Sequence, residues 1–479
     1  MEKNKKCNRV SKEVMESQAC YITQIWELNK EYEKRVGRSK QAYILTLGCQ
    51  QNEADSEKLG GMAEAMGYEV VHSPEQASLI LVNTCAIREH AEKRALSMVG
   101  QFKHLKAARP ELVIGICGCM VVQEHRIQDI KHRYPYVDLL FGTAAIHRFP
   151  ELLFKKLQSG KRVLLPQGEE YLVAEEIPIR RENSFRAWVS VMYGCNNFCS
   201  YCIVPYVRGR ERSRSKEAVI EEVKDLVAKG YKDITLLGQN VNSYGKDLGG
   251  EYDFADLLSE LDAIEGDHWL HFMTSHPKDA TRKLIDVMAS ARHVAHHFHL
   301  PMQSGSDRVL HAMNRRYTFE KYIGTLDYIR EKMPDAVITS DIIVGFPGET
   351  EEEFEETLNA LRRARFDMIF SFIYSPRKGT PAAEMDCQIA PKEQSRRYDI
   401  LLSVQNEISL ESNRRLEGKR LRVLCDGPSK SREEVYGGRT EGGKIVFFDG
   451  CPEQIGQFVT IEIERGDTFA LYGKIIENH

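Results

Sequence analysis

GCNNFCSYCIVPYVRGRERSRS, residues 194–215, follows an apolar run at 187–192 and contains a C-x3-C-x2-C motif. The motif cysteines are Cys195, Cys199 and Cys202. If the apolar run is a parallel strand, the motif stands at its carboxyl end, where α/β barrels place their active sites. A structural zinc site takes four protein ligands, and the next cysteine along the chain is Cys387. Three thiolates favour a [4Fe–4S] cluster with one open iron position, and the alternative is a zinc loop that borrows a distant ligand.

The composition is that of an ordinary globular protein. The 479 residues suffice for about three domains, and the chain is 42% hydrophobic and 28% charged, with a net charge of −4. Nucleic-acid binding would therefore require a local basic patch. The sequence contains no apolar run of ~18 residues, as a membrane span needs, and we do not expect a secretory signal. Twelve cysteines are too sparse for a disulfide scaffold, and we expect a cytoplasmic protein.

Short apolar runs alternate with helical stretches on the carboxyl side of the motif. Strands are expected at 187–192, 233–237, 269–273, 297–300, 337–344 and 368–374. Six β-α units favour a partial TIM-like barrel over a second open sheet. This predicts a barrel domain over residues 185–412.

An α/β domain with a parallel sheet is predicted at 41–148. Its strands are expected at 43–47, 79–83, 112–116 and 138–141, with helices at about 52–66 and 88–106. Continuous apolar strands separated by helices are typical of a parallel sheet covered on both faces. No glycine-rich phosphate loop follows any of these strands.

The remaining segments carry weaker patterns. Residues 1–40 are interpreted as an N-terminal extension that is partly helical, and 149–184 as a connector. In the last segment, 413–479, short strands separated by Gly, Pro and Asp predict a small, closed or half-open OB-like β-barrel. These strands are expected at 421–425, 435–440, 444–448, 458–464 and 469–476.

A second set of cysteines lies in the N-terminal α/β domain. Cys49, Cys85 and Cys119 are 36 and 34 residues apart, and each comes just after a predicted strand. Because the carboxyl ends of parallel strands line one edge of a sheet, these thiols are expected to converge on a second metal site. Cys117 is a rival for Cys119, although Cys117 still belongs to the strand. The alternative is that these cysteines are small core residues.

The C-x3-C-x2-C motif, with the aromatic Tyr201 before its third cysteine, resembles that of the radical S-adenosylmethionine (SAM) enzymes. Together, the two cysteine sets and the small β-domain resemble the methylthiotransferases over about residues 41–477. The branch that modifies dimethylallyladenosine in tRNA is the most similar. The resemblance is carried by GCQQN at 48–52 with Asp55-Ser56, NTCAIRE at 83–89, residues 194–215, LGQNVN at 237–242 and Gly438-Arg439-Thr440.

This resemblance implies two [4Fe–4S] clusters, each held by three cysteines. The cluster on Cys195, Cys199 and Cys202 would bind and cleave SAM, and the resulting 5′-deoxyadenosyl radical would take hydrogen from C2 of adenine. The cluster on Cys49, Cys85 and Cys119 would deliver sulfur, which a second SAM methylates. The candidate SAM contacts are Tyr201, Gln239, Asn240, Ser275, Gln303 and Asp341, with a polar rim as the alternative role. The segment 341–350 also matches the family, and its Gly/Pro turn is expected to shape the SAM pocket.

The implied substrate is N6-isopentenyladenosine next to the anticodon, in the anticodon stem-loop of tRNA. The small β-domain resembles the RNA-binding TRAM module, and the implied electron donor is a flavodoxin or ferredoxin. Residues 180–216 hold eight Lys/Arg and two acids, which indicates a phosphate-binding patch or, alternatively, a loop with internal ion pairs. Three other functions remain open. Two of them are methylthiolation reactions, of threonylcarbamoyladenosine in tRNA or of an aspartate in a ribosomal protein. The third is RNA binding by a zinc module without catalysis.

Overall fold

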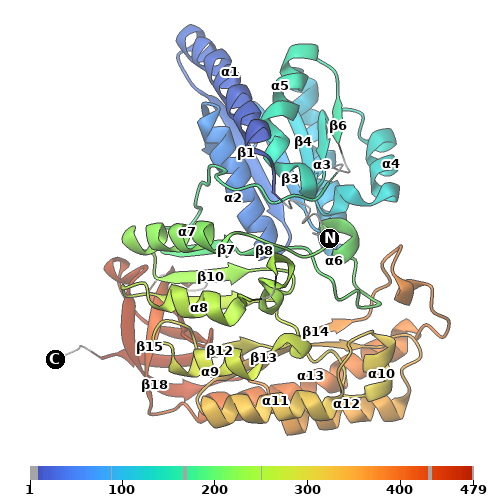
Figure 1. Cartoon of the computed structure of the whole chain (residues 1–479), viewed down its shortest axis with the longest axis vertical. Coiled ribbons are helices and arrows are strands. Elements are labelled where there is room, and N and C mark those ends of the chain that lie inside the picture. The colour runs from blue at the N-terminus through green and yellow to red at the C-terminus, as the bar shows by residue number, and fades with distance from the viewer. Residues whose placement is uncertain (1–8, 88, 166–169, 250, 430–433, 477–479) are drawn as a thin grey trace. The chain divides into compact units, whose positions relative to one another are not determined.

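The computed structural model describes residues 9–87, 89–165, 170–249, 251–429 and 434–476 (Figure 1). Residues 1–8 of the predicted extension and 477–479 of the predicted C-terminal domain therefore lie outside the described part. The chain divides into two units. The first comprises 1–182, 192–196 and 203–218, and the second comprises 183–191, 197–202 and 219–479. Within the described residues, no helix has the length and apolar content to cross a membrane.

A parallel sheet in the order β2-β1-β3-β4-β5-β6 forms the centre of the first unit. Its strands are β1 (Lys40–Leu47), β2 (Tyr68–Val71), β3 (Leu79–Thr84), β4 (Val113–Gly118), β5 (Leu139–Phe141) and β6 (Val163–Leu165). In β3, Leu79 and Leu81 enter one hydrophobic core, and Ile80 and Val82 enter the other. Both faces of the sheet are thus buried, which explains why its strands are continuously apolar.

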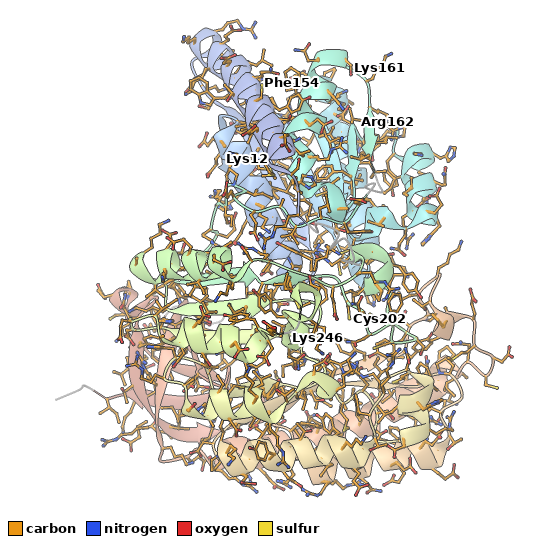
Figure 2. The ribbon with its side chains drawn as sticks, in the orientation of Figure 1. Lys12, Phe154, Lys161, Arg162, Cys202 and Lys246 are labelled. Atoms are coloured by element: carbon orange, nitrogen blue, oxygen red, sulfur yellow. The ribbon has the colours of Figure 1, made fainter. Side chains whose placement is uncertain are left out.

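Helices cover the two faces of this sheet. The first face is covered by α1 (Lys12–Val36), α2 (Gln50–Ala65) and α5 (Phe149–Ser159), and the second by α3 (Glu89–Ala108) and α4 (Glu124–Arg133). Tyr21 of α1 packs against Phe154 of α5, with ring centroids 5.4 Å apart (Figure 2). The helix α1 is capped by Ser11 and ends at Gly37, which has a φ of 79°. The predicted extension is therefore largely one long helix that completes a core.

The segment interpreted as a connector, 149–184, contains regular structure. It includes α5 and β6, and β6 extends the sheet beside β5. The short strand β2 also lies outside the predicted strands. Both β2 and β6 are edge strands of three or four residues, which is too short for periodicity to distinguish them from a loop.

Parallel strands of an α/β barrel fold build the second unit. They form two sheets, β11-β10-β7 and β12-β13-β14, and a parallel bridge joins Leu270 of β11 to Val294. The strands are β7 (Arg186–Ser190), β10 (Asp233–Leu237), β11 (Trp269–Met273), β12 (His297–His299), β13 (Val337–Val344) and β14 (Met368–Ile373). The helices that follow strands include α8 (Phe254–Asp262), α9 (Arg282–Ser290), α10 (Asp307–Ala312), α11 (Phe319–Lys332), α12 (Glu351–Ala364) and α13 (Pro391–Arg414). The α/β class predicted for this region is confirmed.

The C-terminal strands close into a barrel in the order β15-β16-β17-β19-β18. They are β15 (Arg420–Pro428), β16 (Val435–Thr440), β17 (Ile445–Asp449), β18 (Phe458–Gly466) and β19 (Leu471–Ile475). Val423, Val446 and Ile461 lie in its core. The barrel also packs on the rest of the second unit, since Arg422 pairs with Asp267 and the ring of Phe458 lies 4.5 Å from that of Trp269.

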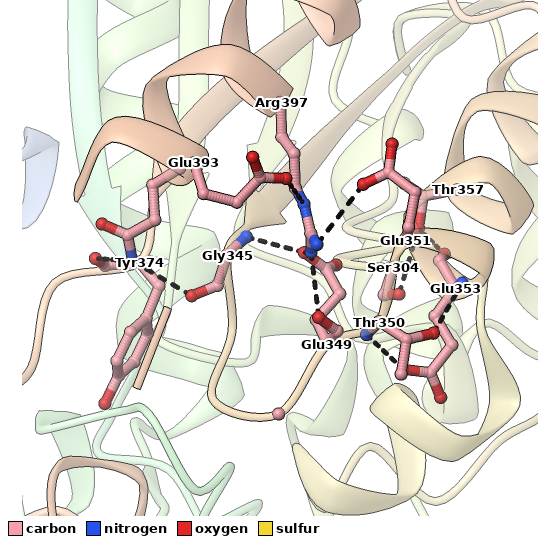
Figure 3. A network of polar contacts seen from close by, with 12 residues as sticks. Ser304, Gly345, Glu349, Thr350, Glu351, Glu353, Thr357, Tyr374, Glu393 and Arg397 are labelled. Carbon is pink, nitrogen blue, oxygen red and sulfur yellow. Dashed lines mark hydrogen bonds and ion pairs between the residues drawn. The ribbon is translucent and has the colours of Figure 1, made fainter. Parts of the chain in front are cut away.

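A buried ion pair holds the turn that follows β13 (Figure 3). The Glu349 Oε2 atom accepts hydrogen bonds from the Gly345 backbone N at 2.8 Å and from Arg397 Nη1 at 3.0 Å. Arg397 in α13 also donates to Glu393, and Gln394 donates to the Gly345 carbonyl at 3.1 Å. Burial raises the pKa of Glu349 despite these contacts. The turn is thereby fixed against α13.

Replacing the cation of this pair should destabilise the second unit. We expect Arg397→Met to lower the free energy of unfolding by about 3–5 kcal/mol, because Glu349 would keep a buried charge without its partner. Urea denaturation followed by tryptophan fluorescence measures this, since Trp188 and Trp269 both lie in the second unit. The exposed neighbour Arg396 provides the control, and Arg396→Met should cost less than ~1 kcal/mol. Equal losses in the two variants would contradict the role of the buried pair.

Candidate metal centres

Three cysteines meet at the carboxyl edge of the first sheet. Cys49 follows β1 and caps α2, Cys85 follows β3, and Cys119 follows β4. Because β1, β3 and β4 are neighbours in the sheet, their carboxyl ends are adjacent. The thiols of Cys49 and Cys85 share a hydrogen bond, and both of these cysteines interact electrostatically with Cys119. We refer to Cys49, Cys85 and Cys119 as the first-unit triad.

The two loops that carry Cys49 and Cys85 are joined by asparagine side chains. Asn52 Nδ2 donates to Asn83 Oδ1 at 3.0 Å and to the Thr84 carbonyl at 3.2 Å. Asn83 Nδ2 donates in return to the Asn52 carbonyl at 2.8 Å. These buried contacts fix the position of one cysteine relative to the other.

Cys117 and Cys119 have different surroundings. Cys117 lies in β4 and is part of the hydrophobic core, whereas Cys119 lies beside Cys49 and Cys85. Between them, Gly118 has a φ of 95°, and a Cβ at this position would lie 2.4 Å from the Thr84 carbonyl oxygen. A glycine is therefore required for the turn that carries Cys119 out of the strand.

A buried arginine supplies positive charge to the triad. Arg208 is 5% exposed, and its Nη2 atom donates to Asp55 Oδ2 at 2.8 Å. The hydrogen bond from Cys85 lowers the pKa of Cys49 to about 6, with a further contribution from the charge of Arg208. Burial raises the pKa of Cys119 to about 11, and Arg208 opposes that rise. The site thus favours a thiolate at Cys49 and holds a cation that can balance further negative sulfur.

The three thiols of the triad are donors of the kind that hold iron–sulfur clusters. Within the described residues, no group of three His, Cys, Asp or Glu side chains is arranged to hold one metal ion. A [4Fe–4S] cluster presents a separate iron to each thiolate, so its ligands stand apart instead of converging on one point. Three cysteines beside a buried arginine therefore suit a cluster with one open position.

The C-x3-C-x2-C motif is held by hydrogen bonds within each unit. In the first unit, the Cys195 backbone N donates to the Gly209 carbonyl at 3.1 Å. The second unit contains Cys199 and Cys202, and Figure 2 labels Cys202. In this unit Asn314 Nδ2 donates to the Phe198 carbonyl at 2.9 Å. Phe198 itself has a φ of 48°. Such a conformation is uncommon for a bulky residue and is typical of functional loops.

Sequence reasoning missed Arg315, which contacts one of the motif cysteines. Arg315 is buried, and its Nη1 atom lies 3.4 Å from Cys199 Sγ. Its Nη2 atom donates to the Pro301 carbonyl at 2.9 Å, and its guanidinium group lies over the ring of Tyr317. In the sequence, Arg315 stands beside Arg316, and no pattern separates the buried arginine from its exposed neighbour. It supplies Cys199 with a fixed cation, as Arg208 does for Cys119.

Three of the candidate SAM contacts are joined around His299. Ser275 donates to the His299 carbonyl, and His299 Nε2 lies 3.5 Å from Asp341 Oδ1. The Gln303 backbone N donates to the Asp341 carbonyl at 2.8 Å. Asp341 lies within β13. Its carboxylate faces His299 of the neighbouring strand β12.

The other candidates lie elsewhere around the barrel. Tyr201 packs in a hydrophobic cluster with Ile343 and Phe346. Gln239 and Asn240 follow β10, and Asn240 Nδ2 donates to Asp279 Oδ2 at 2.9 Å. Asp279 also pairs with Lys246, which Figure 2 labels. Asn240 is therefore engaged in a polar network at the carboxyl end of β10.

A buried histidine at the end of β11 offers an unused donor. His276 Nδ1 accepts a hydrogen bond from the Lys278 backbone N at 3.2 Å, so Nε2 carries the proton. Among the described residues, this buried Nε2 atom has no hydrogen-bond partner. Two residues before it, Thr274 has a φ of 68°, which is strained for a β-branched side chain. A buried orphan donor and local strain both fit a site that receives a polar ligand such as SAM.

The arginines expected to form a phosphate-binding patch are mostly buried. Arg208, Arg212 and Arg214 are each less than 10% exposed. Arg208 pairs with Asp55, and Arg214 Nε pairs with Glu175 at 2.8 Å. The prediction of a phosphate footprint at these positions was wrong, and the alternative of internal ion pairs describes them better. Net local charge in a sequence does not distinguish a solvated arginine from one that balances a buried acid.

Comparisons with known proteins extend over almost the whole chain. Residues 41–142 match the uncharacterized protein family UPF0004, 189–361 the radical SAM superfamily and 414–476 the TRAM domain. The tRNA-2-methylthio-N(6)-dimethylallyladenosine synthase of Desulforamulus reducens is 48% identical over 443 residues, or 92% of this chain and 97% of the relative. The enzyme of the same name from Acetivibrio thermocellus is 47% identical over 467 residues, or 98% and 97%.

Among solved structures, the fold is similar to that of the radical S-adenosylmethionine methyltransferase TsrM from Kitasatospora setae. The TM-score is 0.53 at 14% identity, and the match covers 72% of this chain and 75% of TsrM. At that identity the likeness concerns the fold alone. By the near-full-length identity to its relatives, the chain belongs to the tRNA-2-methylthio-N(6)-dimethylallyladenosine synthase family of radical SAM enzymes.

Proposed function

We propose that the chain is a tRNA methylthiotransferase that adds a methylthio group to C2 of N6-dimethylallyladenosine next to the anticodon. The observation that carries this proposal is the 48% identity to a synthase of that name over 97% of its length. In the proposed reaction one SAM molecule initiates radical chemistry, and a second SAM molecule donates the methyl group. A flavodoxin or ferredoxin is the proposed electron donor.

Two sets of residues would hold the iron–sulfur groups. Cys195, Cys199 and Cys202 would hold the cluster that binds SAM, and the first-unit triad would hold the second cluster. When bound, these groups would supply the reductive cleavage of SAM at one site and a transferable sulfur at the other. Arg208 and Arg315 would balance the thiolate charge, because each already lies against a cysteine of one set.

Around SAM, the polar groups at the strand ends would orient the ligand. We assign hydrogen bonds to SAM to Gln239, Asn240, Ser275, Gln303 and Asp341, and ring packing to Tyr201. The His276 Nε2 donor, which has no partner among the described residues, is a further group available to the ligand. The turn held by Glu349 and Arg397 would keep the wall beside β13 in place.

The exposed side chains of β14 are apolar, and this supports a substrate that carries an apolar substituent. Met368, Phe370 and Phe372 are each more than a third exposed. They pair in register with Thr339, Asp341 and Ile343 of β13, and the Phe370 ring packs edge-on against His299. An exposed apolar stripe beside the candidate SAM contacts suits a dimethylallyl group. A threonylcarbamoyl group carries a carboxylate, and a binding site for that group would require a cationic side chain instead.

The C-terminal barrel supplies a candidate surface for tRNA. Phe469, in the turn before β19, is 76% exposed, and nearby Arg465 lies 4.2 Å over the ring of Tyr472. Of the two phenylalanines in β17, Phe448 is buried and Phe447 is half-buried. An exposed aromatic ring beside an arginine is typical of surfaces that stack on unpaired bases. We therefore propose Phe469 as a base-stacking residue.

The test of the proposed function is nucleoside analysis of tRNA from a strain that lacks this gene. The 2-methylthio form of dimethylallyladenosine should disappear, and its unthiolated precursor should accumulate, as measured by mass spectrometry. Loss of the methylthio group from threonylcarbamoyladenosine alone would assign the chain to that substrate. No change in either nucleoside, with loss of a methylthio group from a ribosomal-protein aspartate, would refute a tRNA substrate.

Single cysteine variants should separate the two proposed clusters. Cys199→Ala should abolish both SAM cleavage and product, because the SAM-binding cluster would lose a ligand. Cys85→Ala should retain SAM cleavage without thiolated product, because the sulfur-delivering site alone would be damaged. Chromatography of 5′-deoxyadenosine and of digested tRNA measures the two outcomes. Full thiolation by the Cys85 variant would be incompatible with a sulfur-delivering cluster at the triad.

Removing the exposed aromatic ring of the C-terminal barrel should weaken tRNA binding. Phe469→Ala should lower the affinity for tRNA about 5- to 150-fold, because stacking on one base contributes ~1–3 kcal/mol. Filter binding at fixed salt measures the effect, and SAM cleavage without tRNA should not change. The matched control is Ile455→Ala, since Ile455 is an exposed apolar residue of the same barrel that cannot stack. Unchanged affinity in the Phe469 variant would remove this surface from the interface.

A further inference from the structure

A small cavity in the first unit is lined by more positive than negative side chains. Its volume is about 50 Å³, room for a small ion or a few water molecules. The charged residues in its wall are Lys58, Arg208, Arg212 and Asp55. Apolar side chains, including Ile146 and Leu172, complete the lining.

Lys58 is the unusual member of this wall. It is only 9% exposed, and its Nζ atom donates to the hydroxyl of Tyr193 at 2.5 Å and lies 5.0 Å from the centre of that ring. Among the described residues, no carboxylate lies within ion-pair distance of Lys58 Nζ. A buried ammonium group whose hydrogen-bond partner is neutral is costly, because no counter-charge stabilises it.

The one carboxylate in the wall is already engaged. Asp55 accepts hydrogen bonds from Arg208 at 2.8 Å and from Gln51 at 3.2 Å. Arg212 donates to the Arg208 carbonyl and lies over the ring of Tyr171. His147, which also lines the cavity, adds no charge near neutral pH because burial lowers its pKa to about 4. Asp55 is therefore engaged with Arg208, and Lys58 has no counter-charge in the described part of the wall.

We propose that this cavity binds a small anion, and that in the working enzyme this anion is a sulfur species such as hydrosulfide. The anion would lie between Lys58 and Arg208 and supply the counter-charge that the wall lacks. Arg208 also contacts Cys119, so the cavity shares a side chain with the first-unit triad. The assignment of the anion as a sulfur species rests on the proposed function, in which a sulfur atom must reach the triad. The existence of the anion site rests on geometry and charge alone.

Anomalous diffraction from the cluster-containing protein tests the anion site directly. Crystals in which bromide replaces chloride should show an anomalous peak within hydrogen-bond distance of Lys58 Nζ. Lys58→Met, which preserves side-chain length but removes the charge, should abolish that peak. The control is Lys12→Met, which removes an exposed lysine of α1. Tyr193→Phe gives a second test if Lys58→Met fails to fold, and it should retain the peak because the ammonium group remains.

Sulfide dependence of thiolation tests the identity of the anion. The sulfide concentration that gives half-maximal thiolation should rise about tenfold in Lys58→Met, equivalent to ~1.4 kcal/mol, while the half-saturating SAM concentration stays unchanged. Competition by bromide against sulfide should weaken in the same variant. These shifts, together with the bromide peak, would support a sulfur-anion site.

The opposite results would overturn the inference in distinguishable ways. No peak in the cavity, or an equal peak in Lys58→Met, would refute the anion site. A peak that Lys58→Met abolishes without any change in sulfide dependence would indicate an adventitious ion only and refute the sulfur assignment. If the unmodified enzyme forms no methylthio product at any sulfide concentration, the proposed function fails, and the sulfur identity fails with it. The bromide peak would still decide whether the cavity is an anion site.

Discussion

Negative sulfur inside a protein needs positive charge that is fixed in place, and both cysteine sets of this chain meet that requirement with a buried arginine. Arg208 contacts Cys119 and pairs with Asp55, and Arg315 contacts Cys199. Away from water, such a cation interacts more strongly with a thiolate than it would at the surface. Each arginine is itself held in place by a hydrogen-bond acceptor. Arg208 donates to the carboxylate of Asp55, and Arg315 donates to the carbonyl of Pro301.

Parallel strands then determine where the sulfur atoms can be. In the first unit, β1, β3 and β4 are adjacent, so the residues that follow them lie at one edge of the sheet although they are more than 30 residues apart. The same rule places Ser275 and Gln303 beyond the ends of β11 and β12. Backbone conformations at these edges are unusual, with positive φ at Gly118, Thr274 and Gln303. The packed strands maintain these conformations, which at Thr274 and Gln303 are strained for a residue with a side chain.

Much of this architecture could be predicted from the sequence, and the errors have identifiable causes. Strands 233–237, 269–273 and 337–344 were predicted with the bounds that the structure has, because buried parallel strands are continuous apolar runs between clear turn signals. The edge strands β2 and β6 were missed because short edge strands have too little periodicity. In the segment 1–40, the packing of helix α1 against α5 was not visible in the sequence, because it joins residues more than 100 positions apart.

The sequence by itself indicated the reaction class, because the two cysteine sets and the segments around them resemble those of the methylthiotransferases. It also determined that the relevant strands are parallel, since their apolar runs are continuous. Only the tertiary structure decided which charged residues serve the sulfur atoms. Asp55 and Arg208 are 153 positions apart, and Cys199 and Arg315 are 116 positions apart. An arginine that balances a buried charge and one that faces water have the same sequence signature, and their difference arises only when distant segments are packed together.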